Sequence, residues 1–162
     1  MQIQIDSREH KKELARIESQ FDDLGVKHFV SKLFVGDYMS LDNPRVVVDR
    51  KKDLWEICGN ITQQHERFKN ELLRAEDNGI KIIILCEHGG GIKCLEDVFF
   101  WSNYTWRMVN GQRKRVQRGV PGKTLYKTLN TIKDRYGVRF EFCEKEDTGR
   151  RIVELLGGGA DG

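Results

Sequence analysis

The sequence predicts a single domain of the α/β class, and three observations support this. Apolar residues recur at helical spacing in some segments and alternate with polar residues in others. Residues 80–85 form a nearly unbroken apolar run, which is typical of a strand buried on both faces. The 162 residues, of which 38% are apolar, suffice for one sizeable core. We expect one domain over residues 1–156 and a flexible, glycine-rich tail over 157–162.

The composition also excludes several function classes. No apolar run approaches the ~20 residues that span a bilayer, and the first residues lack a secretory signal, so we expect a cytoplasmic protein without a membrane partner. The four cysteines form no C-x-x-C pair, which argues against a redox dithiol or a usual zinc knuckle. The net charge of +3 is too modest to indicate a partner by itself.

The first elements are expected to be a strand, a helix and a second strand. Residues 2–6 alternate polar and apolar side chains, which predicts a short strand. Ser7 is a candidate N-cap for a helix whose apolar residues recur at helical spacing, namely Leu14, Ile17, Phe21 and Leu24. Gly25 is expected to end this helix, and residues 26–30 to form the next strand.

An antiparallel hairpin is predicted next. Residues 33–41 and 45–51 are β-like runs, and Asp42-Asn43-Pro44 between them is a turn signal. If the hairpin is centred near Asn43, Asp37 faces Asp49 across it. Residues two apart on a strand share a face, so Asp49 and Lys51 should point one way and Arg50 the other.

The rest of the chain is expected to return to helices and buried strands. Asp53 can cap a helix that runs to Asn78-Gly79, with Gly59-Asn60 as a candidate break. A strand at 80–85 is followed by an irregular, aromatic and basic insertion at about 95–121. Leu125, Leu129 and Ile132 then predict a helix, 138–143 a strand and 150–156 a last short helix.

The predicted hairpin places two carboxylates and a lysine together. Two directly opposed carboxylates destabilise each other by up to ~1 kcal/mol unless a cation lies between them. Oxygen ligands of this kind suit Mg²⁺ or Mn²⁺, and such a cation can polarise a phosphodiester. Asp37, Asp49 and Lys51 are therefore candidates for a metal-dependent hydrolytic site. The alternative that the same spacing allows is that Asp37 and Asp49 are solvated acids near a turn.

The insertion is the candidate surface for DNA. Between residues 98 and 131 the chain has no Asp or Glu, and its cations suit an anionic polymer. Aromatic rings in the same segment could stack on unpaired bases or could belong to the core. The residues we expect to bind DNA here are Arg113, Lys114, Arg115, Arg118 and Lys123.

Short motifs in the first third of the chain resemble a known family. They are Ile5-Asp6-Ser7-Arg8-Glu9, Val35-Gly36-Asp37-Tyr38 and Val48-Asp49-Arg50-Lys51, in this order. Together they resemble the XPF/Hef-type nuclease domain of the PD-(D/E)XK superfamily over about residues 2–87, and more weakly to Cys143. The resemblance implies a restriction-endonuclease-like central mixed β-sheet flanked by helices. It also implies Mg²⁺-dependent cleavage of branched, flap or junction DNA, with Mn²⁺ able to substitute.

The resemblance also assigns roles to individual residues. It implies that Asp37 and Asp49 ligate the metal and that Lys51 is the catalytic lysine, with Arg50 in the same motif. It implies supporting catalytic roles for Asp6, Arg8 and Glu9, and it makes Arg67 the family's arginine in the following helix. A homodimer is expected by the same analogy. The small size is typical of a phage or prokaryotic member.

The sequence departs from the family pattern at three places. Asp49 stands where Glu is more usual, Glu71 replaces a glutamine, and Trp55 occupies the position of an acid four residues after the lysine. Trp55 is the main argument for an alternative, a DNA-binding partner subunit that has kept the fold and lost cleavage. A third interpretation, a non-catalytic interaction module with a basic face, leaves the three ordered motifs unexplained. The sequence shows no helix-hairpin-helix pair for binding the duplex, so the insertion is expected to do so.

Overall fold

The computed structural model describes residues 1–9 and 11–158. Its strands, in chain order, are β1 (Gln2–Ile5), β2 (Lys27–Val30), β3 (Tyr38–Ser40), β4 (Asn43–Lys51), β5 (Lys81–Cys86), β6 (Tyr104–Val109), β7 (Gln112–Gln117) and β8 (Arg139–Phe142). A six-stranded central sheet has the order β2-β1-β3-β4-β5-β8. β3 is antiparallel to its neighbours β1 and β4, whereas the neighbouring pairs β1–β2, β4–β5 and β5–β8 are parallel. The central sheet is therefore mixed, as predicted.

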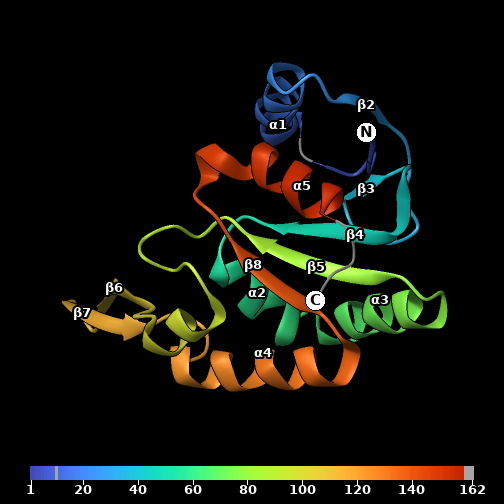
Figure 1. The fold of residues 1–162 in the computed structure, drawn as a ribbon. Helices are drawn as coiled ribbons and strands as arrows, with labels where there is room; N and C mark the ends of the chain where they lie inside the picture. Colours follow the sequence, from blue (N-terminus) through green and yellow to red (C-terminus); the bar gives the residue numbers. More distant parts are fainter. Residues whose placement is uncertain (10, 159–162) are drawn as a thin grey trace.

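Helices cover both faces of this sheet (Figure 1). The α-helices are α1 (Lys11–Asp23), α2 (Leu54–Ile61), α3 (His65–Asp77), α4 (Gly122–Tyr136) and α5 (Thr148–Gly157), with short 3₁₀ helices η1 (Leu95–Phe100) and η2 (Lys145–Asp147). α1 and α5 pack on one face, and α2, α3 and α4 on the other. Within residues 1–9 and 11–158, no helix combines the length and apolar character needed to cross a bilayer.

β4 separates the two halves of the core because its side chains alternate. Val46 and Val48 pack with the α1 and α5 layer, whereas Val47 packs with the α2, α3 and α4 layer. The same alternation places Asp49 and Lys51 on the side of Val47 and Arg50 on the side of Val48. Asp49 and Lys51 thus share one face of β4 and Arg50 lies on the other, as predicted from the sequence.

The β3–β4 hairpin agrees with the prediction in register but not in extent. Tyr38 pairs with Val48 and Met39 with Val47, the register that sets Asp37 opposite Asp49. The turn lies at Leu41-Asp42 instead of Asp42-Asn43-Pro44, and an irregularity between Met39 and Ser40 absorbs the shift.

Residues 33–37, predicted as strand, form none. Leu33 N donates to Asp6 Oδ1 at 2.9 Å, and Gly36 has a φ of +70°, so the chain bends before it enters β3.

The predicted ends of other elements also need correction. α1 begins at Lys11, so Ser7 is not its N-cap; the residues around Ser7 instead contact the site described below. The helix after Asp53 is divided into α2 and α3, with the break at residues 62–64, just after the predicted Gly59-Asn60. Of the predicted tail, Gly157 ends α5, and residues 159–162 lie outside the described part of the chain.

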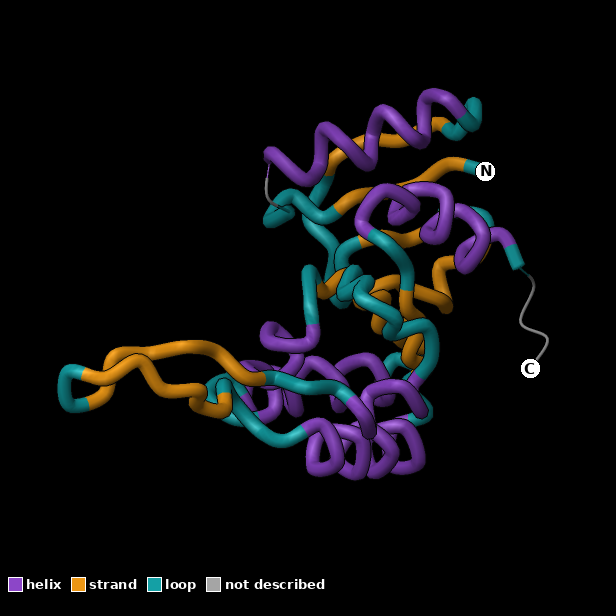
Figure 2. The backbone as a smooth tube through the Cα atoms, turned by 90° about the vertical axis from the view of Figure 1, so that its left-hand side faces the viewer, coloured by secondary structure: helices purple, strands orange, loops and turns teal. Residues whose placement is uncertain are grey.

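The insertion is more regular than expected. After η1, β6 and β7 form a separate two-stranded antiparallel hairpin that does not join the central sheet. Figure 2 shows it extending away from the helical layer. Its two-residue turn is Asn110-Gly111, with φ values of +52° and +75°, the backbone that a tight hairpin of this twist requires. The Asn-Gly pair was the sequence signal for this hairpin.

Candidate active site

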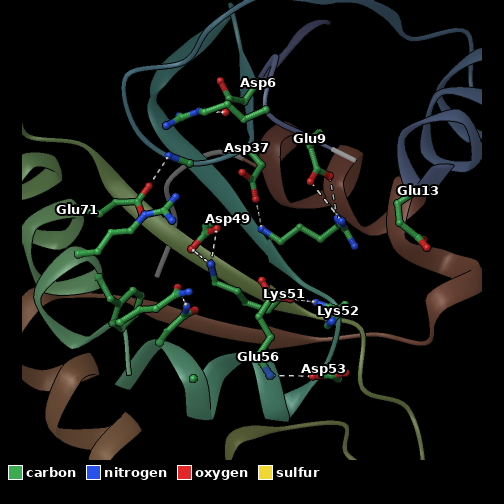
Figure 3. A pocket seen from close by; sticks show the side chains of 18 of the residues that line it. Asp6, Glu9, Glu13, Asp37, Asp49, Lys51, Lys52, Asp53, Glu56 and Glu71 are labelled. Atoms are coloured by element: carbon green, nitrogen blue, oxygen red, sulfur yellow. Dashed lines mark hydrogen bonds and ion pairs between the residues drawn. The ribbon is translucent and has the colours of Figure 1, made fainter. Parts of the chain in front are cut away.

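The motif residues meet at one large cavity beside the end of β4. The cavity has a volume of about 860 Å³ and is lined from the residues after β1, the segment before β3, the end of β4, and α2 and α3. Asp37, Asp49 and Lys51 lie together in it (Figure 3). The structure thus brings together the two carboxylates and the lysine that the sequence singled out.

Asp37 is positioned by backbone contacts with β4. Its backbone N donates to Val48 O at 2.9 Å, and its Oδ2 accepts from Arg50 N at 2.8 Å. Gly36 before it approaches β4 closely, since a Cβ there would lie 3.0 Å from Val47 Cγ2. Glycine at this position therefore allows the chain to turn the Asp37 carboxylate towards Asp49.

Asp49 and Lys51 form a buried ion pair on the cavity side of β4. Lys51 Nζ lies 2.9 Å from Asp49 Oδ2, and both residues are less than a tenth exposed. Burial disfavours the charged form of the lysine, but the negative charges of Asp49 and Asp37 outweigh it and raise the pKa of Lys51. Lys51 therefore stays protonated at neutral pH and acts as a fixed cation instead of a base.

The pKa of Asp37 is raised as well, but for an acid this favours the neutral form. Burial, followed by the negative charge of Asp49, raises its pKa well above the usual value for an aspartate, although Lys51 counteracts this. The site accommodates a proton on Asp37 readily, because two ionised carboxylates repel each other there. A bound cation would remove the same repulsion.

The residues present fit a hard divalent cation. Mg²⁺ commonly uses only one or two carboxylates and keeps water and phosphate oxygens as its other ligands. Asp37 and Asp49 supply two such carboxylates. No group of three or more His, Cys, Asp or Glu side chains suited to a metal occurs within residues 1–9 and 11–158. The fit therefore rests on this pair and its electrostatic coupling.

Trp55, at the position where the resemblance leads us to expect an acid, is part of an aromatic cluster. It lies in the first turn of α2 and packs against His88 and Trp101, with ring centroids 5.3 Å and 5.2 Å away. The Arg118 guanidinium lies 4.8 Å from the centre of the Trp55 ring, and both residues line the cavity. The neighbouring acid Asp53 is used as the N-cap of α2, accepting from Glu56 N at 2.8 Å.

Arg50 lies on the other face of β4, in a buried ion-pair network. Its Nε donates to Glu9 Oε2 at 2.9 Å and its Nη1 to Glu87 Oε2 at 3.2 Å. Glu87 is 5% exposed, and it also accepts from Arg16 Nη2 and Thr148 Oγ1. This network ties the end of β4 to α1 and α5. Arg16, Glu87 and Thr148 were not predicted from the sequence, because no local pattern connects residues so far apart in the chain.

The first motif supports the cavity wall. Asp6 is almost fully buried and accepts from both Leu33 N and Arg8 Nε, which fixes the segment before β3 against the end of β1. Glu9 Oε2 accepts from the Tyr38 hydroxyl at 2.6 Å as well as from Arg50. The contacts of Asp6, Arg8 and Glu9 are thus with protein groups that position Asp37 and Arg50.

The candidate DNA-binding residues fall into three places. Arg67 of α3 and Arg118 line the cavity itself. Arg113, Lys114 and Arg115 lie on β7 in the projecting hairpin, and all three are exposed. Lys123 is at the start of α4, with its ammonium 5.8 Å from the centre of the Phe99 ring. The run Arg113 to Arg118 is therefore not one surface.

A mixed sheet with an Asp-x-Lys motif at the end of a central strand and a second Asp beside it is the arrangement that the resemblance of the sequence motifs led us to expect. The family model of the ERCC4 domain matches residues 5–155, and the chain therefore belongs to the ERCC4 domain family. The XPF-type resemblance of the sequence is confirmed.

Solved structures show the same fold. XPF from Aeropyrum pernix has 18% sequence identity to this chain and a TM-score of 0.63, over 96% of this chain and 60% of that one. XPF from Aeropyrum pernix in complex with DNA has 19% identity and a TM-score of 0.61, over 96% and 62%. The chain thus spans about three fifths of the length of these structures. A comparison with curated protein sequences gave no significant match.

Proposed function

We propose that this protein is a Mg²⁺-dependent endonuclease that hydrolyses phosphodiester bonds of branched, flap or junction DNA. The observation that carries the proposal is the convergence of Asp37, Asp49 and Lys51 in a cavity of about 860 Å³. The raised pKa values of Asp37 and Lys51 support it, because they reflect a strongly coupled group of charges such as active sites contain. The ERCC4 domain match over residues 5–155 supports the same chemistry.

Each residue has a defined part in this proposal. Asp37 and Asp49 would hold the cation, which supplies Lewis-acid polarisation of the phosphate and a lower pKa for the attacking water. Lys51, kept protonated by the two carboxylates, donates to a phosphate oxygen and offsets the charge that develops on it. Arg67 and Arg118 at the cavity wall bind neighbouring phosphates. Arg50, Glu9 and Asp6 act indirectly, by holding β4 and the segment before β3.

The proposal is tested by incubating the protein with labelled branched, flap and linear DNA. We expect cleavage with Mg²⁺ or Mn²⁺, none with chelator, and a preference for the irregular DNAs. Absence of cleavage on every DNA with either metal would overturn the catalytic part of the proposal and leave the DNA-binding part to be tested by affinity.

One specific observation favours a second candidate, an inactive DNA-binding partner subunit. Trp55 packs into an aromatic cluster where the family has an acid, so the site lacks that carboxylate. Trp55→Asp distinguishes the two functions. If the natural chain is inactive and this variant gains metal-dependent cleavage, the partner-subunit function is correct.

A homodimer and a cytoplasmic location belong to the same proposal. The dimer rests on analogy with the family, in which nuclease domains pair, because one small domain covers little duplex. Light scattering at tens of micromolar protein tests it. A monomer with full cleavage activity would remove the dimer from the proposal.

A further inference from the structure

The two faces of the β6–β7 hairpin differ in chemistry. The register pairs Trp106 with Arg115 and Met108 with Arg113, so residues alternate consistently between the faces. One face, called the aromatic face below, carries Tyr104, Trp106, Met108, Arg113 and Arg115. The opposite face carries Arg107 and Lys114 as its charged residues. Cations are thus present on both faces, but aromatic rings are on one only.

The aromatic face is open to solvent. Tyr104 is 50% exposed, Trp106 58% and Met108 69%, which is unusual for three large apolar side chains side by side. The Arg115 guanidinium lies 4.3 Å from the centre of the Tyr104 ring, and that of Arg113 lies 5.5 Å from the centre of the Trp106 ring. Tyr104 and Trp106 therefore do not belong to the core, whereas Trp101 of the same segment packs against it.

The base of the hairpin is fixed to the catalytic cavity. Asn103, only 1% exposed, donates from its side chain to Arg118 O at 2.7 Å and to Val120 O, while Arg118 N donates to Asn103 O at 2.7 Å. These bonds close the hairpin at its root. The Arg118 side chain then stacks on Trp55 and lines the cavity. The root of the hairpin therefore borders the cavity.

Charge and ring chemistry together indicate one occupant. The segment from 98 to 131 has no acidic residue, so the hairpin attracts a polyanion. A duplex offers phosphates, but its bases are stacked inside and cannot reach an aromatic side chain. Unpaired nucleotides offer both a phosphate and a free base, which suits a face with arginines beside exposed rings.

We propose that the aromatic face binds unpaired nucleotides of DNA where they leave the duplex held at the catalytic cavity. Trp106 and Tyr104 stack on the bases, Arg113 and Arg115 contact the adjoining phosphates, and Arg107 and Lys114 on the opposite face contribute only non-specific attraction. The proposal rests on the proposed function for the duplex in the cavity. It adds the surface of this chain that contacts the unpaired strand, namely the aromatic face of the β6–β7 hairpin.

The test measures binding in chelator, so that no cleavage is needed. Fluorescence anisotropy compares a labelled duplex that carries a single-stranded arm with a blunt duplex of the same length. Trp106→Ala should weaken binding of the armed duplex by roughly 5- to 150-fold, the range for loss of one stacked base, and leave the blunt duplex nearly unchanged. Trp106→Phe, which keeps a ring, should recover most of the affinity.

A matched control lies on the opposite face. Arg107→Ala with Lys114→Ala removes two charges and no ring, so it should weaken both DNAs by similar factors. It should also flatten the slope of log affinity against log salt by up to ~2 units, whereas Trp106→Ala should leave that slope unchanged. Circular dichroism of each variant serves as the control for correct folding.

The inference is overturned if Trp106→Ala weakens both DNAs equally or neither, or if it changes only the oligomeric state, which would make this face an interface between copies of the chain. A 2-aminopurine placed in the single-stranded arm should be quenched by the natural protein and not by Trp106→Ala. Absence of cleavage in the assay with Mg²⁺ or Mn²⁺ would overturn the proposed catalytic activity. It would not affect binding measured in chelator, so the two failures are distinguishable.

Discussion

The cavity that contains Asp37, Asp49 and Lys51 and the β6–β7 hairpin are held in place by different physical means. Asp37, Asp49 and Lys51 are fixed by backbone bonds to β4 and by the buried contacts behind it, whereas β6 and β7 pair with each other and leave both faces exposed. The comparison separates two tasks. Hydrolysis needs charges held within a fraction of an ångström, and substrate capture needs only a reachable surface. Substitutions in the two regions should therefore affect different steps.

The largest effect is expected at the carboxylates. Asp37→Ala and Asp49→Ala should each lower the rate of metal-dependent cleavage by a factor on the order of 10³, because each removes a ligand for the cation. DNA binding should change little. The check is the cleavage rate at saturating DNA beside affinity in chelator. Retention of more than about a tenth of the natural rate in both variants would contradict the assignment.

The buried network behind β4 provides the next effect, on stability. Glu87→Gln should lower the free energy of unfolding by about 2 kcal/mol, because Arg50 keeps Glu9 but loses the buried negative charge of Glu87, which Arg16 also contacts. Glu13, which contacts the same Arg16 near the surface, is the matched control: Glu13→Gln should cost less than ~1 kcal/mol. Denaturant titration measures both. Equal losses would show that burial of the network does not position β4.

In the hairpin, the expected effect is on salt-dependent affinity. Replacing Arg113, Lys114, Arg115 and Arg118 by alanine should flatten the slope of log affinity against log salt by up to ~3 units on duplex DNA, because fewer counterions are released. Arg118 also lines the cavity, so a second variant with only Arg113, Lys114 and Arg115 replaced by alanine isolates the contribution of the hairpin. An unchanged slope in both variants would move the DNA surface to Arg67 and its surroundings.

The smallest effect is the pH dependence of the metal-free protein. Because the pKa of Asp37 is raised in the folded state, the proton stabilises the fold at low pH, and this stability is lost as the pH rises through the raised pKa. Asp37→Asn cannot ionise, so in chelator it should be more stable than the natural protein at neutral pH, by up to ~1 kcal/mol. Thermal unfolding from acid to neutral pH tests this. The prediction is contradicted if the natural protein becomes more stable relative to Asp37→Asn as the pH rises from acid to neutral.

The sequence predicted the positions of Asp37, Asp49 and Lys51 better than their surroundings, because short-range periodicity determines those positions. Strand alternation put Asp49 and Lys51 on one face, and the register of the β3–β4 hairpin put Asp37 beside them, as the sheet has them. The Arg16–Glu87–Arg50 network joins residues far apart in sequence, so no local pattern could predict it. The β6–β7 hairpin has two local signals, the Asn110-Gly111 turn and the alternation of Tyr104, Trp106 and Met108 with other residues in β6. β7 is almost entirely polar, so periodicity alone gives it no apolar face and does not predict that it is a strand.

The division between hydrolysis and capture is tested most directly by single-turnover cleavage as a function of DNA concentration. The measurement compares the natural protein, Asp49→Ala and the variant with Arg113, Lys114 and Arg115 replaced by alanine. Our account predicts that the hairpin variant recovers most of the natural rate at saturating DNA, whereas Asp49→Ala remains slow at every concentration. A hairpin variant that stays slow at saturation, or an Asp49→Ala variant that recovers, would contradict it.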